Sequence, residues 1–150
     1  MAVFVKQMAR RQADRRAVAR GGRRSSDKRR RSVKPIVLVV DAHQAEREMT
    51  AYYLESLGLD TVQAPSGREA LAQARGCHLA LVELVLPDGS GLALAAQLRA
   101  ARVAVVIHPS GATPEAREAV AAAGLPFLLK RSDLTVLAKR VLAAWQRVAA

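Results

Sequence analysis

Short apolar runs alternate with helix-like segments throughout residues 35–150, and this alternation constrains the fold more than any other feature. The first run, Ile36–Val40, is continuously apolar, which is typical of a strand buried on both faces. Four further strands are predicted at Asp60–Gln63, Leu79–Leu84, Val103–Ile107 and Pro126–Leu129. Strands separated by helices pair in parallel through right-handed crossovers, and five strands are too few for an eight-stranded barrel. We therefore predict an α/β fold, a doubly wound five-stranded parallel sheet with helices on both faces.

Residues that flank the apolar patterns predict where helices begin and end. Ser66 and Glu69 form a capping box at the start of one helix. Thr113 and Pro114 cap and start another, which Gly124 ends. These signals agree with the alternation of strands and helices.

The spacing of apolar residues predicts which face of each helix is buried. The helix over Glu46–Leu57 is expected to turn three residues inward, namely Met49, Tyr53 and Leu57. The helix over Gly91–Ala100 should bury Leu94 and Leu98. The last helix, Asp133–Val148, carries a stripe made of Leu134, Leu137, Val141, Trp145 and Val148.

Positive charge is concentrated in residues 1–34, which contain 13 Lys/Arg and 2 Asp, whereas residues 35–150 contain 11 Lys/Arg and 11 Asp/Glu. The first segment lacks apolar periodicity, and it cannot offset the entropy cost of ordering by burial. We predict a basic, Arg-rich disordered tail over 1–34, followed by one domain over 35–150. Three interpretations of the tail remain open: a basic arm that contacts phosphates or acidic surfaces, an inert solvated tail, and a mis-assigned start, because VKPIVLVVD from Val33 is typical of a domain's natural beginning.

The composition argues against several classes of protein. Aromatic residues make up 3% of the chain, which disfavours base-stacking nucleic-acid modules. Cys77 is the only cysteine, so an intramolecular disulfide is excluded and a cysteine metal site is not expected. No apolar run approaches the roughly 20 residues of a membrane span, and the opening Ala2–Val5 is too short for a signal peptide. We expect a cytoplasmic protein that makes no membrane contact.

A polar residue stands at, or directly after, the carboxyl end of four of the predicted strands. These residues are Asp41, Glu83, His108 and Lys130. The carboxyl ends of parallel strands meet at one edge of a sheet, where such folds bind their ligands. The sequence therefore predicts that these four side chains lie together at one edge.

Three stretches of the chain carry a more specific pattern: VLVVD at 37–41, LVELVLPDGSGL at 81–92, and PFLLKR at 126–131. Together they resemble the receiver domain of two-component response regulators, the CheY-like superfamily, from Val37 to about Trp145. The resemblance implies the flavodoxin-like strand order 2-1-3-4-5. It also implies a chemistry, in which an aspartate accepts a phosphoryl group from a histidine kinase. Two further acids and a backbone carbonyl hold Mg²⁺, and a Thr or Ser and a Lys bind the phosphoryl oxygens.

The acceptor and metal positions depart from this family pattern. Glu83 stands at the phosphoacceptor position, which is normally Asp. Asp41 matches the first acid, but Ala42 replaces the second, and Val85 supplies the carbonyl position. Only Asp41, Glu83 and Val85 remain as a vestigial metal set. We expect no metal and no cofactor, with Mg²⁺ binding weak or lost.

The positions that would read out phosphorylation are also altered. His108 stands at the Thr/Ser position, and Phe127 stands at the position of the switch aromatic. Phe127 is interpreted either as a half-packed wall residue or as a moving switch. Lys130 is retained, but Arg131 replaces the proline that usually follows it.

These features favour an atypical, single-domain receiver that acts in phosphorelay signal transduction without being phosphorylated and is not an enzyme. It would bind another signalling protein, either a histidine kinase or an output protein, and its oligomeric state stays open. Two alternatives remain: a conventional phospho-accepting receiver, and a nucleic-acid-associated protein that uses residues 1–34.

Two hypotheses concern the role of Glu83. In the first, an ion pair with Lys130 holds the domain in one signalling state; in the second, Glu83 is a tolerated relic of the acceptor. His108 is either a partner of Glu83, which would make the domain pH-sensitive near neutrality, or a histidine satisfied at the edge of the site.

Overall fold

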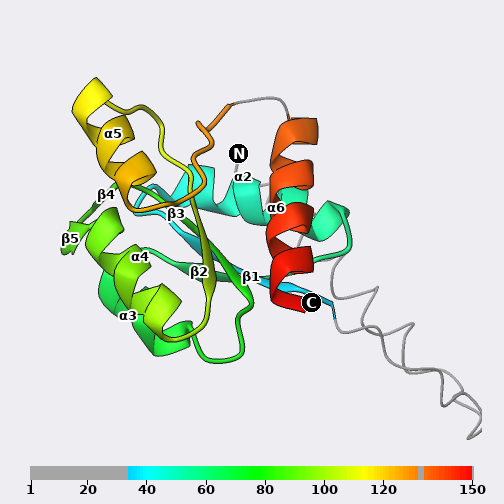
Figure 1. The fold of residues 1–150 in the computed structure, drawn as a ribbon. Helices are drawn as coiled ribbons and strands as arrows, with labels where there is room; N and C mark the ends of the chain where they lie inside the picture. Colours follow the sequence, from blue (N-terminus) through cyan, green and yellow to red (C-terminus); the bar gives the residue numbers. More distant parts are fainter. Residues whose placement is uncertain (1–33, 132–133, 150) are drawn as a thin grey trace, which may run out of the picture. The chain divides into compact units, whose positions relative to one another are not determined.

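The computed structural model describes residues 34–131 and 134–149, and these form a parallel sheet covered by helices on both faces (Figure 1). The sheet consists of β1 (Ile36–Val40), β2 (Asp60–Ala64), β3 (Leu79–Val82) and β6 (Ala104–Ile107). Their order is β2-β1-β3-β6, and every neighbouring pair is parallel. The predicted α/β fold is confirmed. The tail predicted for residues 1–34 lies, apart from Lys34, outside the described residues.

The fifth predicted strand lies at the expected edge, beside β6, but it contributes a single parallel bridge between Ile107 and Phe127. The Ile107 N–H donates to the Pro126 carbonyl, and the Leu128 N–H donates to the Ile107 carbonyl, both at 2.9 Å. Pro126 has no N–H with which to extend this pairing toward the start of β6. The segment is therefore shorter than predicted, although it completes the expected order.

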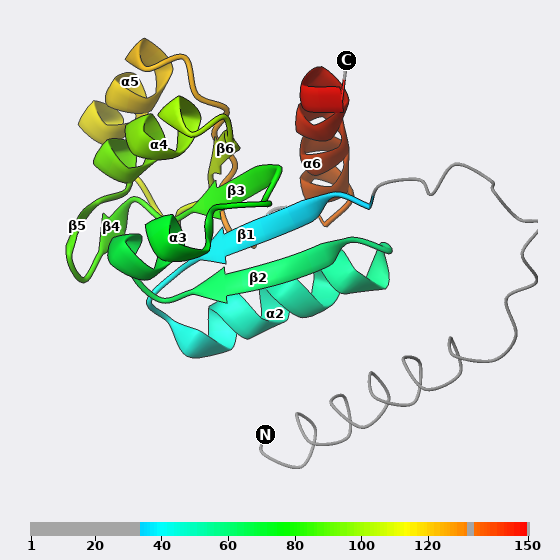
Figure 2. The same ribbon diagram turned by 90° about the horizontal axis from the view of Figure 1, so that it is seen from below.

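Helices cover the two faces of the sheet separately (Figures 1 and 2). One face packs against α2 (Gln44–Ser56) and α6 (Leu134–Ala149), through a core that includes Leu54, Leu137 and Val141. The other face packs against α3 (Gly67–Gln73), α4 (Gly91–Ala100) and α5 (Pro114–Ala122). None of the described helices combines the length and the apolarity that crossing a membrane requires.

The caps agree with the sequence. The Ser66 side chain accepts from the Glu69 N–H, and the Thr113 side chain accepts from the Ala116 N–H. Gly124 follows α5 with a φ of 67°, in the left-handed region that favours glycine.

The buried faces of the helices agree with the sequence in two helices and disagree in one. Leu94 and Leu98 of α4 are buried, as are Leu137 and Val141 of α6. In α2, Tyr53 packs against the core as predicted, but Met49 is 73% exposed and Leu57 is 43% exposed, so the prediction that these two face the core is wrong.

The buried residues of α2 are instead Ala51 and Leu54. Arg47 begins this stripe, and its guanidinium donates to the Asp41 carbonyl and to the Gln63 side chain. The inner face of α2 therefore begins with a charged residue. A search for apolar residues at helical spacing does not identify this face for that reason.

A two-stranded antiparallel hairpin, β4 (Val85–Leu86) and β5 (Gly89–Ser90), leads from β3 into α4. Gly91 opens α4 in close contact with the preceding chain, since a Cβ at this position would lie 2.0 Å from the Glu83 carbonyl oxygen. Only glycine permits this approach. The glycine that ends the PDGSG turn thus fixes the helix directly against the backbone of Glu83.

Candidate functional site

The strand register aligns three of the four predicted site residues. Val40 pairs with Val82, and Val82 pairs with Ile107. The next residues are Asp41, Glu83 and His108, which therefore leave neighbouring strands at the same carboxyl edge. Two hydrogen bonds continue the sheet to this point, from the Glu83 N–H to the Val40 carbonyl (3.1 Å) and from the His108 N–H to the Val82 carbonyl (2.8 Å).

Lys130 joins them from the other side of β6. Its backbone N–H donates to the Pro109 carbonyl at 2.8 Å, which brings the side chain over the sheet edge. The Nζ atom contacts Asp41 Oδ2 and lies 2.7 Å from Glu83 Oε2. The Lys130 side chain is 8% exposed, so its charge is stabilised by the carboxylates more than by solvation.

A third carboxylate, which the sequence analysis did not single out, belongs to Glu46. Its Oε2 lies 2.9 Å from Lys130 Nζ, and its Oε1 lies 3.4 Å from Arg131 Nη2. Glu46 stands in the first turn of α2, which starts directly above the end of β1. The sequence signal that could have indicated Glu46 is an acid in the first turn of this helix, five residues after Asp41.

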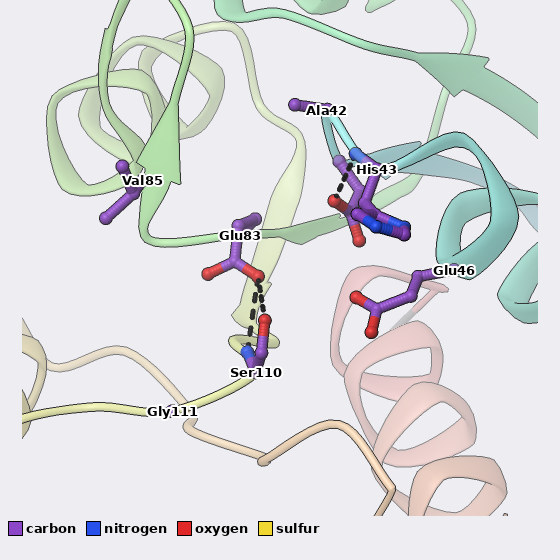
Figure 3. A pocket seen from close by; sticks show the side chains of 8 residues that line it. Ala42, His43, Glu46, Glu83, Val85, Ser110 and Gly111 are labelled. Atoms are coloured by element: carbon purple, nitrogen blue, oxygen red, sulfur yellow. Dashed lines mark hydrogen bonds between the residues drawn. The ribbon is translucent and has the colours of Figure 1, made fainter.

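Each oxygen of the Glu83 carboxylate has a partner. Oε1 accepts from the Leu84 N–H at 2.8 Å. Oε2 accepts from Lys130, and also from the N–H (3.2 Å) and the hydroxyl (3.1 Å) of Ser110 (Figure 3). The hydroxyl that reaches Glu83 therefore comes from Ser110, two residues beyond the position that the resemblance implies. Loop geometry brings Ser110 there, and no spacing rule marks it.

The charges at the site shift the pKa values in consistent directions. Burial acts to raise the pKa of Glu83, but the hydrogen bonds and charge of Lys130, with the N–H groups of Leu84 and Ser110, outweigh it, and the pKa lies below its usual value. The hydrogen bond from Lys130 lowers the pKa of Glu46 in the same way. Burial acts to lower the pKa of Lys130, but its three carboxylate partners raise it well above its ordinary value. Glu46, Glu83 and Lys130 are therefore charged near neutral pH.

His108 is 7% exposed, and its environment keeps it neutral. Burial, reinforced by the charge of Lys130, lowers the pKa of its imidazole to about 4. A histidine with this pKa does not titrate between pH 6 and 8. The hypothesis of a pH-sensitive pair with Glu83 near neutrality therefore loses its basis.

The oxygens that would ligate a metal are already engaged. Asp41 Oδ1 accepts from the His43 N–H at 2.9 Å, while Oδ2 contacts Lys130. Ala42 adds no oxygen ligand, and the described residues contain no group of three or more His, Cys, Asp or Glu side chains arranged to hold a metal ion. An octahedral Mg²⁺ site needs several oxygen ligands, and at the family's metal positions this chain offers the carboxylates of Asp41 and Glu83 and the carbonyl of Val85.

An open hollow with a volume of about 470 Å³ lies above the carboxylates, with Asp41, Glu46, Glu83 and Ser110 among its walls (Figure 3). Val85, at the metal-carbonyl position, stands on its wall with a side chain that is 79% exposed.

Phe127, at the position of the switch aromatic, lies on the neighbouring face. It is half-buried and packs against the core beneath α5, and the Arg117 guanidinium lies 4.9 Å from its ring centroid. This distance is typical of a cation–π contact. Phe127 is thus held between the core and a side chain of α5.

Asp88 is a further residue with a defined role. Its carboxylate accepts from the N–H groups of Gly67 and Arg68, both at 2.9 Å, at the start of α3. These hydrogen bonds hold the pKa of Asp88 below its usual value. Asp88 therefore links the β4–β5 hairpin, which borders the hollow, to the start of α3.

Comparison with known proteins agrees with this geometry. Residues 37–142 match the family model described as the response regulator receiver domain. The chain is 30% identical over 117 residues to the CAI-1 autoinducer sensor kinase/phosphatase CqsS of Vibrio cholerae, and 26% identical over 108 residues to a cyclic di-GMP phosphodiesterase of Thermotoga maritima. These matches cover 73% and 70% of this chain, but only 17% and 29% of those proteins.

Solved structures show the same fold. A response regulator receiver protein from Pseudomonas putida is 31% identical, with a TM-score of 0.68, over 75% of this chain and 98% of that one. A CheY-like receiver domain protein from Methanospirillum hungatei has a TM-score of 0.71 at 22% identity, over 77% of this chain and 97% of that one.

Proposed function

Because the chain belongs to the response regulator receiver family of two-component signalling, we propose that it is an atypical member that signals without being phosphorylated. The observation that carries this proposal is the set of contacts made by Glu83 Oε2. This oxygen already binds Lys130 Nζ and both donors of Ser110, which are groups suited to holding a phosphoryl oxygen. The permanent negative charge of the Glu83 carboxylate would thus take the place of the transient charge of a phosphoryl group.

The length of the glutamate side chain supports the same conclusion. Glu83 extends the normal aspartate by one methylene, about 1.5 Å of chain. Phosphoryl transfer depends on positioning and charge neutralisation, and a misplacement near 1 Å can cost about 100-fold in rate. Both carboxylate oxygens of Glu83 that could attack a phosphoryl donor are moreover already engaged. Oε2 binds Lys130 and Ser110, and Oε1 accepts from the Leu84 N–H.

The engaged donor set supports a site at which Mg²⁺ binding is weak or lost. With Ala42 in place of the second acid, the ion would have to displace Lys130 from Asp41 and Glu83 to find ligands. That displacement would leave the Lys130 ammonium, which is 8% exposed, with Glu46 as its remaining carboxylate partner. The protein would therefore work without a cofactor, as a binding module rather than an enzyme.

The partner would be another signalling protein, either a histidine kinase or an output protein, in the cytoplasm. The surface formed by α5, residues 126–129 and α6 is a candidate contact for it. Exposed cations lie on its two helices, namely Arg117, Lys139 and Arg140. The cations of α6 suit a partner with an acidic patch, while α5 also exposes Glu115 and Glu118.

Phosphorylation with a small-molecule donor tests the proposal. The purified protein is incubated with acetyl phosphate and Mg²⁺, and its intact mass is measured. We expect no adduct, while the double variant Ala42→Asp with Glu83→Asp, which restores both family acids, should gain one phosphoryl group. Stoichiometric modification of the unaltered protein would overturn the proposal.

A further inference from the structure

Ser110 links the carboxylate cluster to the loop that leads into α5. Its N–H and its hydroxyl both donate to Glu83 Oε2, at 3.2 and 3.1 Å. Two donors from one residue on one oxygen fix the position of that residue more tightly than either bond alone. The side chain of Ser110 is exposed, so its orientation is set by this contact rather than by packing.

The chain from Ser110 to α5 is short. Thr113, three residues later, is the N-cap of α5, and its hydroxyl oxygen accepts from the Ala116 N–H at 3.1 Å. Its carbonyl accepts from the Arg117 N–H at 3.0 Å. Three residues span at most about 11 Å. This short connection can absorb little of a displacement of Ser110, so the displacement is passed on to the first turn of the helix.

The helix in turn contacts Phe127. Val120 on α5 is fully buried in the core against which Phe127 packs, and Arg117, on the same helix, lies over the Phe127 ring. A continuous series of contacts therefore runs from Glu83 through Ser110 and α5 to the aromatic residue at the sheet edge.

We propose that Ser110 is a positioning residue that couples the Glu83 carboxylate to the placement of α5 and Phe127. This inference rests on the proposed phosphorylation-independent function, and it names the residue that transmits the fixed charge of Glu83 to the outer face. His108 stands at the position where the family resemblance would place that role, but its imidazole is buried, whereas Ser110 makes the contact.

Amide hydrogen exchange measured by NMR on the full chain tests the coupling. In Ser110→Ala, which loses the hydroxyl bond, we expect amides of α5 to exchange about fivefold faster, the effect of one lost hydrogen bond. Amides of α3 serve as the internal control and should keep their rates. Ser110→Thr retains a hydroxyl and should restore slow exchange.

A double-variant cycle shows whether Ser110 acts through Glu83. Glu83→Met keeps a side chain of similar length but removes the acceptor, while Lys130 retains two carboxylates. In this background, Ser110→Ala should no longer accelerate exchange in α5. The proposal fails if the fivefold factor persists there, if Ser110→Thr behaves like Ser110→Ala, or if α5 is unaffected in every variant.

If Glu83→Met does not fold, the single variants decide. Faster exchange in α5 for Ser110→Ala, with rescue by Ser110→Thr, supports the coupling, and equal behaviour of the two refutes it. These measurements use no phosphoryl donor. Phosphorylation of the unaltered protein would therefore overturn the proposed function, while unchanged exchange in α5 would overturn only the role of Ser110.

Discussion

Replacing Lys130 by methionine tests whether the carboxylate cluster stabilises the fold. The substitution keeps an unbranched side chain and removes the one cation that contacts Asp41, Glu46 and Glu83. The side chains of these three acids are 6%, 24% and 12% exposed, so water replaces the lost cation poorly. Removing one side of a buried ion pair typically costs about 3–5 kcal/mol, which corresponds to a fall in Tm of about 10–20 °C for a domain of this size.

The effect should depend on pH with a definite sign. The pKa values of Glu46 and Glu83 are lowered in the folded protein, so their contribution to stability is present above their unfolded pKa and is lost as pH falls through the folded pKa. In Lys130→Met, burial and mutual repulsion act without the Lys130 charge, and the exposed Arg131 remains beside Glu46 alone, so these pKa values rise. The variant is therefore expected to regain stability relative to the unaltered protein between pH 7.5 and about 4.

Urea unfolding at pH 7.5 and at about pH 4, followed by the fluorescence of Trp145 and by circular dichroism, measures the difference in the free energy of unfolding between the variant and the unaltered protein. Lys139→Met is the matched control, because Lys139 is an exposed lysine of α6, and it should change the free energy of unfolding by less than about 0.5 kcal/mol. A loss below about 1 kcal/mol for Lys130→Met at pH 7.5 would place the cluster with loose surface pairs and refute the reasoning. So would a loss that is the same at both pH values.

Three other substitutions or titrations follow from the structure. Gly91→Ala brings a Cβ within 2.0 Å of the Glu83 carbonyl oxygen and should destabilise the protein by about 1–3 kcal/mol or more in urea unfolding, whereas Gly111→Ala, where a Cβ meets nothing within 4 Å, should be close to neutral. Asp88→Ala should lower Tm at pH 7, and the difference from the unaltered protein should shrink in acid, because the pKa of Asp88 is lowered in the folded state and its contribution is lost as pH falls through that value. The imidazole proton shifts of His108, followed by NMR, should stay constant from pH 8 to pH 5.5, because burial lowers its pKa to about 4; a midpoint near 6.5 would contradict the burial of this side chain.

The sheet could be predicted from the sequence because its strands are short, apolar and separated by helices. In a parallel sheet the end of each apolar run marks the same edge, so the residues after the runs, Asp41, Glu83 and His108, follow one another across it. This inference needs only the period of the pattern, with no knowledge of side-chain contacts.

The parts that could not be predicted depend on local geometry. Ser110 reaches Glu83 because the chain bends after Pro109, and Glu46 reaches Lys130 because α2 begins directly above β1. The inner face of α2 was missed for a different reason. Two stripes at helical spacing compete there, and the one predicted to be buried includes Met49 and Leu57, which are exposed.

The charge balance at the sheet edge gives a reason for a glutamate at position 83. A phosphoryl group adds about 1.5–2 negative charges, and accepting it requires cations that can be recruited at that moment. Lys130 is already shared among three carboxylates, and Ala42 removes a ligand that would help to bring a metal ion. The longer side chain of Glu83 instead carries its carboxylate out to Ser110 while keeping Lys130. Under the proposed function, a change of state comes from a partner that displaces Ser110 or α5, since Lys130 is already shared among three carboxylates.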